Sequence, residues 1–279
     1  MGAAERTLLD KPWREIDWGQ KDNLLKFLKT YKPKGASHLR ILLYGPVGAG
    51  ESSFINSAAS VIKGTLVNMA GVEGSNMATQ SFTVCFKTHK IRTDDGTKIP
   101  IVFNDIMGLE ARQSVGVRPE DIYLAMKGHV KDGYRFDPKK ALSPEDDEYN
   151  KNPSVDDKVH VLVCLLKANA TDISDHVLEK MMEVKEMARD LGIPQMAIAT
   201  HIDQIYIDIE KDVQKVYRSI ALKKKMEFFS SKVGIATIYI YPVRNNYEGP
   251  DQKAVDVLLL TALKRMVDFG NDFLLNLND

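Results

Sequence analysis

Cysteine is scarce in this sequence, since two of its 279 residues, Cys85 and Cys164, are cysteines. Both stand in apolar stretches that are typical of strands. We interpret them as buried free thiols in a reducing compartment, because a secreted protein stabilised by disulfides would contain more cysteines.

Net charge and long apolar runs are also absent. The 38 basic side chains balance the 38 acidic ones, which gives no indication of nucleic acid or an anionic membrane as the main partner. No apolar run reaches the roughly 20 residues that a membrane-spanning helix needs, and the first residues lack the apolar segment of a signal peptide. We therefore expect a protein that binds neither a membrane nor nucleic acid.

What the sequence does contain is a glycine-rich turn between a strand and a helix. Residues 41–44 are apolar and typical of a buried parallel strand, and residues 54–62 have helical spacing. Between them, Gly45, Gly48 and Gly50 come close to the phosphate-binding pattern G-x-x-x-x-G-K-[ST]. Glycines let backbone N–H groups approach phosphate oxygens, and the start of the helix adds partial positive charge.

Glu51 departs from this pattern, because it stands where the pattern requires lysine. A carboxylate about 4 Å from a phosphate charge repels it by roughly 4 kcal/mol at an effective dielectric constant near 20. We therefore expect a phosphate-binding loop in which nucleotide binding is impaired by Glu51. The residues predicted to line the phosphates are Gly45, Gly48, Ala49, Gly50, Glu51, Ser52 and Ser53.

A second polar motif, D-x-x-G, follows an apolar strand at Asp105 and Gly108. The strand is predicted over residues 98–104, as the second arm of a hairpin whose first arm spans residues 81–92. Asp105 would then stand at the carboxyl end of a strand, where α/β sheets bind ligands, and Gly108 could donate its N–H to a γ-phosphate. We predict that Ser52, Asp105 and a threonine, either Thr79 or Thr83, hold Mg²⁺.

A third strand end carries Thr200, His201 and Asp203, a variant of the guanine-reading motif [NT]-K-x-D. An aspartate here can accept hydrogen bonds from guanine that adenine does not offer. His201 replaces the usual lysine, and either lies against the base or faces solvent. Backbone near Arg244 and Asn245 is predicted to touch the guanine as well.

Hydrolysis requires a group that orients water, and the residue after Gly108 is Leu109, which has no polar side chain. Either Glu110 or a partner subunit would have to supply that group, and without one the site would not hydrolyse nucleotide.

Strands alternate with helices along the chain, which predicts an α/β fold with a mostly parallel sheet between two helical layers. We expect residues 1–36 to form an N-terminal helical extension packed on a domain of residues 37–279, with an acidic insertion near residues 131–158. The further strands are predicted at 159–166, 196–203 and 235–243, and the further helices at 119–130, 173–191, 210–232 and 253–277.

The strings PWREIDW, GPVGAGESSFINS, FNDIMGLE and THID resemble the interferon-induced protein 44 family over most of the chain. The resemblance implies a P-loop GTPase-like domain, Mg²⁺ with GTP or GDP as ligands, a cytoplasmic location and a role in antiviral innate immunity. The loop of that family normally reads GAGKSS, so Glu51 is a departure from the family as well.

Three hypotheses follow from these motifs. The first is a GTPase-fold protein of the antiviral response whose nucleotide site is impaired by Glu51. The second is a slow but working GTPase in which Glu51 turns away or pairs with a lysine. The third is an interaction scaffold that uses the fold without nucleotide, and a homo-oligomer is possible in each case. An ATP-dependent kinase is disfavoured by Asp203.

Overall fold

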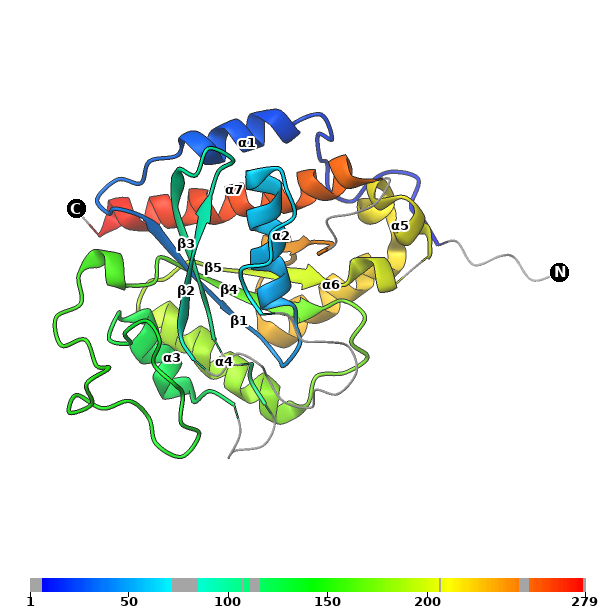
Figure 1. Ribbon diagram of the computed structural model, residues 1–279. Helices are drawn as coiled ribbons and strands as arrows, with labels where there is room; N and C mark the ends of the chain where they lie inside the picture. Colours follow the sequence, from blue (N-terminus) through cyan, green and yellow to red (C-terminus); the bar gives the residue numbers. More distant parts are fainter. Residues whose placement is uncertain are drawn as a thin grey trace.

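The computed structural model describes residues 7–71, 85–106, 108–110, 116–205, 207–245 and 251–277. It contains one six-stranded sheet in the order β2-β3-β1-β4-β5-β6 (Figure 1). Only the β2–β3 pair is antiparallel, as expected for a hairpin, and the other pairs are parallel. The strands are β1 (Leu39–Tyr44), β2 (Lys87–Arg92), β3 (Lys98–Asp105), β4 (Val161–Lys167), β5 (Gln195–Thr200) and β6 (Ile240–Pro242).

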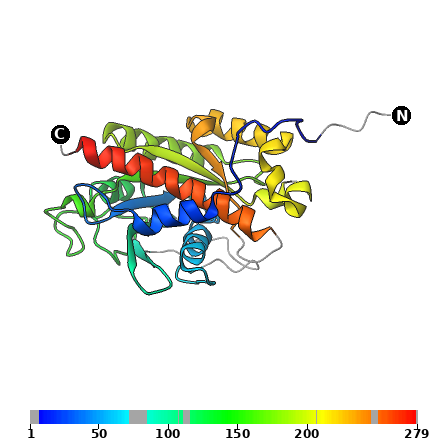
Figure 2. The ribbon, with the colours of Figure 1, turned by 90° about the horizontal axis from the view of Figure 1, so that it is seen from above.

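Helices cover both faces of the sheet, which confirms the predicted α/β class. On one face lie α1 (Lys21–Thr30), α2 (Glu51–Lys63) and α7 (Gln252–Asn276), and α1 runs alongside α7 (Figure 2). On the other lie α3 (Pro119–Met126), α4 (Asp175–Asp190) and α6 (Ile220–Val233), with the short α5 (Ile207–Lys211). Because β1 and β4 are covered on both sides, nearly all their side chains are buried. Within the described residues, no helix combines the length and the apolar character that a membrane span requires.

Four predicted elements differ from the structure, among them the strand predicted over residues 196–203, which ends at Thr200. The helix predicted over residues 210–232 is interrupted twice: Val213–Arg218 form a 3₁₀ helix, and the extended backbone of Ser219 with its side-chain cap on Leu222 N–H starts a new helix, α6. The helix predicted to reach residue 130 ends at Met126, because Gly128 has a left-handed φ of 83°. The last strand has three residues, since Thr237–Tyr239 form a 3₁₀ turn. Of the predicted strand 81–92, the structure describes residues 85–92, and β2 begins at Lys87.

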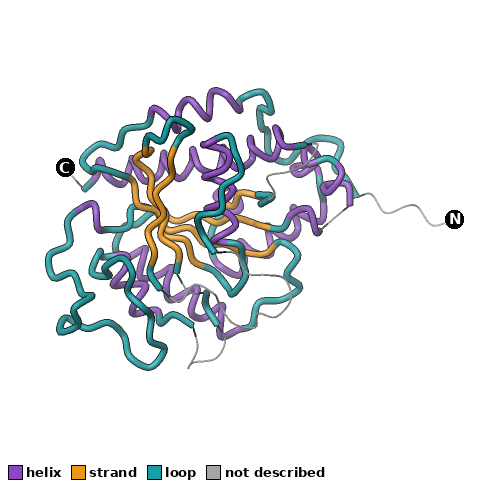
Figure 3. Tube along the Cα trace, in the orientation of Figure 1, coloured by secondary structure: helices purple, strands orange, loops and turns teal. Residues whose placement is uncertain are grey.

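Residues 131–158 form an irregular excursion that is drawn mostly as loop in Figure 3. The chain that leads from this excursion back into β4 is held by His160. The Nδ1 atom of His160 accepts from Arg40 N–H (2.9 Å), and its Nε2 donates to Val155 O (2.9 Å). The Arg40 guanidinium donates to Asp156 O (2.9 Å) and Asn104 Oδ1 (2.7 Å). These contacts lie at the start of β1. The excursion is therefore held at the amino ends of the parallel strands, whereas the glycine loop lies at their carboxyl ends.

The segment before α1 packs against the other end of the chain. Arg14 lies between the rings of Trp13, Tyr217 and Tyr241, with its guanidinium carbon 5.0–5.3 Å from each ring centroid. The same guanidinium donates to the carbonyls of Ile240 (2.9 Å) and Thr237 (2.8 Å). Arg14 therefore fixes the N-terminal segment to β6 and to the 3₁₀ turn before it.

Candidate functional site

The glycine loop connects β1 to α2 at the carboxyl edge of the sheet. Gly48 and Gly50 have φ values of 72° and 104°, which side chains with a Cβ rarely adopt. Helix α2 begins directly after Gly50, whose carbonyl accepts the first intrahelical bond from Phe54 N–H (2.8 Å). The loop thus leads into the N-terminus of a 13-residue helix, where free N–H groups favour an anion.

Glu51 turns inward, toward the interior of this loop. Its side chain is 8% exposed, and a Cβ placed on Gly45 would lie 2.9 Å from Glu51 Oε1. Burial raises the pKa of the Cys164 thiol on β4, and the nearby negative charge of Glu51 adds to that rise. The carboxylate therefore lies beside Gly45, inside the turn that leads into α2.

Ser52 and Asp105, the two residues predicted from separate motifs to hold Mg²⁺, lie in contact. β1 and β3 are parallel, with Leu43 opposite Asp105, so the carboxyl end of β3 faces the glycine loop. Ser52 Oγ donates to Asp105 Oδ2 (2.7 Å), and Asp105 is 3% exposed. A hydroxyl and a carboxylate in contact form an oxygen donor pair of the kind that Mg²⁺ prefers, so these two residues fit the ion. The third predicted ligand, Thr79, and its alternative Thr83 lie outside the described residues.

Gly108 and Leu109 pack directly on the glycine loop. A Cβ on Gly108 would lie 2.8 Å from Val47 Cα, so only glycine allows this approach. Leu109 N–H donates to Gly45 O (2.8 Å), and the Leu109 side chain is 1% exposed in the core. Because that side chain is both apolar and buried, Leu109 cannot orient water.

Thr200 connects the third motif to the first. Its side chain is fully buried, and its hydroxyl donates to Ala49 O in the glycine loop (2.6 Å). The hydroxyl also lies 2.9 Å from His201 Nδ1, so that nitrogen carries the proton and donates. Thr200 therefore holds the end of β5 against the glycine loop.

His201 is half-buried and faces the glycine loop. It adopts a left-handed φ of 55°, and a Cβ on Gly50 would lie 3.6 Å from its Cε1 atom. Burial lowers the pKa of His201, Lys167 lowers it further, and Asp203 opposes both effects. A neutral ring therefore stands where the guanine motif has a lysine. Asp203 lies in a 3₁₀ turn, Ile202–Gln204, directly after it.

The loop after β6 meets the glycine loop through a side chain. Asn245 Nδ2 lies 3.5 Å from Gly50 O and would lie 3.1 Å from a Cβ on Gly50. Arg244 turns the other way and donates from Nη1 to Glu210 O (3.4 Å). The fold thus brings Asn245 to the predicted site, whereas Arg244 binds the end of α5.

The sequence motifs missed Lys167, the last residue of β4. It lines a cavity of about 240 Å³ together with Pro46, Val47 and Ala49 of the glycine loop. Lys167 pairs in register with Thr200, and among the described residues it forms no ion pair. Its position at the carboxyl end of a predicted strand was the signal that could have identified it.

Comparison with known proteins identifies close relatives but no matching family model. Interferon-induced protein 44 from Mus musculus is 32% identical over 261 residues, which are 90% of this chain and 60% of the mouse protein. Interferon-induced protein 44 from Homo sapiens is 31% identical over 259 residues, 91% of this chain and 57% of the human protein. The chain thus spans about 60% of the length of the mouse relative.

Among solved structures, Toc33 from Arabidopsis thaliana in complex with GDP and Mg²⁺ resembles this chain with a TM-score of 0.50. The identity is 13%, and the match covers 90% of this chain and 96% of the Toc33 chain. At this identity the likeness concerns the fold alone. Together with the glycine loop at the end of β1, it shows that the predicted P-loop GTPase-like fold is correct.

Proposed function

Because the chain belongs to the interferon-induced protein 44 family, we propose that it is a GTPase-like protein in which the Glu51 carboxylate stands in for a bound phosphate. The observation that carries this proposal is the inward orientation of Glu51, 8% exposed and close to Gly45. In this proposal the protein is interferon-induced, cytoplasmic and part of the antiviral response.

The physical argument is a competition between two anions for one site. The N–H groups of the loop and the start of α2 stabilise negative charge, and Glu51 in the first helical turn already provides it. A nucleotide would have to displace that carboxylate and would meet repulsion of roughly 4 kcal/mol at about 4 Å. The affinity for GTP or GDP would then fall by about three orders of magnitude.

The other parts of the proposed nucleotide site surround the loop. Ser52 and Asp105 would hold Mg²⁺, with Thr79 as the proposed third ligand, and the ion would neutralise phosphate charge when bound. The phosphates would lie against residues 45–53 and Gly108. Thr200, His201 and Asp203 would surround the guanine together with the backbone near Arg244 and Asn245, while the Arg244 side chain stays on Glu210 O.

Two related functions are the alternatives. A scaffold that needs no nucleotide is supported by the same inward carboxylate, because the loop is then complete without a ligand. A slow GTPase is supported by Lys167, a cation beside the glycine loop that could offset part of the Glu51 charge. In either case the buried Leu109 side chain argues for slow turnover unless Glu110 or a partner supplies the water-orienting group.

Calorimetric titration with Mg²⁺-GTP tests the proposal. The wild type should give no measurable binding at millimolar nucleotide, Glu51→Gln should bind weakly, and Glu51→Lys should bind most tightly. Glu186→Lys, which makes the same charge change on the exposed surface of α4, is the matched control and should resemble the wild type. Tight binding by the wild type would overturn the role of Glu51, and no binding by Glu51→Lys would favour the scaffold.

The guanine assignment is tested with the Glu51→Lys variant as the starting protein. GTP should bind and ATP should not, and Asp203→Asn should remove that preference because it replaces one acceptor with a donor. Equal affinity for the two nucleotides would contradict the assignment of Asp203.

A further inference from the structure

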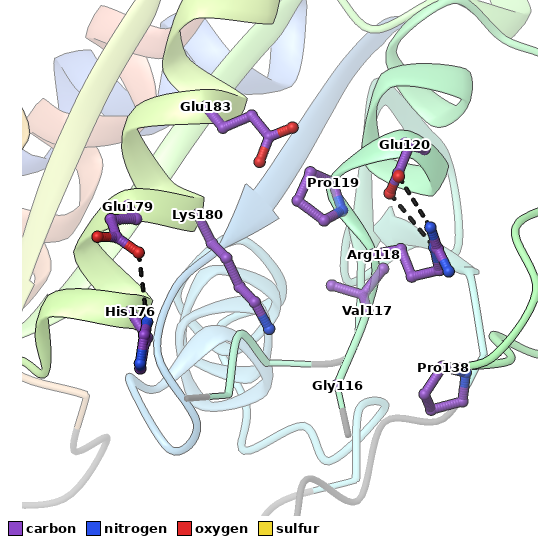
Figure 4. A pocket seen from close by; sticks show the side chains of 10 residues that line it. All are labelled: Gly116, Val117, Arg118, Pro119, Glu120, Pro138, His176, Glu179, Lys180 and Glu183. Atoms are coloured by element: carbon purple, nitrogen blue, oxygen red, sulfur yellow. Dashed lines mark hydrogen bonds and ion pairs between the residues drawn. The ribbon is translucent and has the colours of Figure 1, made fainter. Parts of the chain in front are cut away.

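A second cavity, separate from the glycine loop, lies between α3 and α4. Its volume is about 460 Å³, within the range of sites that bind small ligands. The segment leading into α3 forms one wall, α4 forms the other, and Pro138 of the irregular excursion lies at the rim (Figure 4). Nothing in the proposed nucleotide site uses this cavity.

Four of the charged or titratable side chains around the cavity have a side-chain partner. Arg118 and Glu120 form an ion pair at 2.9 Å, and His176 lies 3.3 Å from Glu179 on α4, a contact that is ionic only when His176 is protonated (Figure 4). Each of these four side chains is therefore already engaged.

Glu183 is the exception. Its carboxylate points from α4 toward Pro119, across the cavity (Figure 4), and it has no hydrogen-bond or ion-pair partner among the described residues. Partial burial raises the pKa of Glu183, the negative charge of Glu120 raises it further, and Lys180 lowers it. Lys180 also lines the cavity; it donates to a backbone carbonyl, Glu110 O (2.7 Å), and forms no ion pair with Glu183 among the described residues. Glu183 is thus a carboxylate without an ion-pair partner that a positive ligand would stabilise.

The opposite wall is suited to a flat cation with an apolar stem. Pro119 and Pro138 are partly exposed and present apolar surface to the cavity, whereas Val117 lines it as a core residue that is 1% exposed. A guanidinium group is planar, donates two parallel N–H bonds to a carboxylate and packs well on flat apolar surfaces, whereas an ammonium is a strongly hydrated point charge. We propose that this cavity binds an arginine side chain of a protein partner, with its guanidinium paired to Glu183 and its methylenes against Pro119.

The cavity also adjoins the segment that follows the D-x-x-G motif. Lys180 holds Glu110 O, and a Cβ on Gly116 would lie 3.1 Å from Gly108 O. A partner bound here would therefore lie next to residues that touch Gly108. The proposed binding of arginine does not depend on whether a nucleotide is present.

The test uses the whole protein and Nα-acetyl-L-arginine methylamide as the probe, with binding followed by NMR chemical shifts. Nα-acetyl-L-citrulline methylamide is the matched control, because citrulline has nearly the shape of arginine without the charge. We expect millimolar binding of the arginine probe that weakens at high salt, and no saturable shifts with citrulline. Glu183→Gln should weaken binding about fivefold, as for a partly exposed ion pair, while Glu186→Gln on the same helix should not.

Three results would overturn this proposal. The first is equal binding of the arginine and citrulline probes, which would show that the charge of Glu183 is not used. The second is unchanged binding by Glu183→Gln, and the third is chemical shifts that map away from Val117 and Glu183. A lysine probe that binds as tightly as arginine would contradict the preference for a planar cation.

Discussion

Thr200→Val tests whether a single hydroxyl holds the third motif against the glycine loop. Thr200 is fully buried, and its hydroxyl lies 2.6 Å from Ala49 O and 3.3 Å from Leu166 O. Valine has nearly the same shape but cannot donate. The substitution therefore removes the short bond to Ala49 and leaves a buried carbonyl without that donor.

The expected loss is the cost of an unsatisfied buried group, about 1–3 kcal/mol of unfolding free energy. In a chain of this size, each kcal/mol corresponds to a change of about 2–4 °C in melting temperature. A loss near the middle of the range, about 2 kcal/mol, thus predicts a melting temperature about 4–8 °C lower.

Urea and thermal denaturation of purified variants measure this effect. Thr200→Ser keeps the donor and should retain most of the bond. Thr261→Val is the matched control, because Thr261 on α7 donates to Val257 O (2.6 Å), a carbonyl within its own helix. Unfolding free energies of Thr200→Val and the wild type that agree within about 0.5 kcal/mol would refute the reasoning.

Two further predictions concern the ends of the sheet. His160 is fully buried, accepts from Arg40 N–H and has its pKa lowered from 6.5 to about 4. Because the unfolded chain binds a proton on this ring at higher pH than the folded chain does, the free energy of unfolding should fall by about 3 kcal/mol from pH 7 to pH 4. In urea denaturation at a series of pH values, His160→Gln should remove this part of the acid sensitivity. A variant with the same pH dependence as the wild type would contradict the prediction. Arg14→Ala should lower the unfolding free energy by about 2 kcal/mol, because it loses bonds to Ile240 O and Thr237 O as well as its ring contacts. Arg14→Lys should recover part of the ring contacts but not both carbonyl bonds, and full recovery would show that charge alone suffices.

The motifs of the candidate site could be identified from short stretches of the sequence. Glycine spacing after an apolar strand identified the loop, and the position of Asp105 at a strand end predicted that it lies at the same edge of the sheet, where the structure has its Oδ2 2.7 Å from Ser52 Oγ. Such predictions succeed because each depends on local periodicity and on the rule that parallel strands direct their carboxyl ends to one edge. The interruption of the helix at Ser219 was missed because a cap inside an amphipathic stretch gives little signal in the pattern of apolar residues.

The amino-acid sequence is enough to show that a glutamate occupies the lysine position of a glycine loop. The place of its carboxylate depends on the fold, because a side chain with several rotatable bonds has both outward and inward rotamers. The same holds for Thr200, whose partner Ala49 is 151 residues away in sequence. Long-range contacts of this kind depend on the register in which β1, β4 and β5 pair in the sheet, and no local pattern of residue types encodes that register.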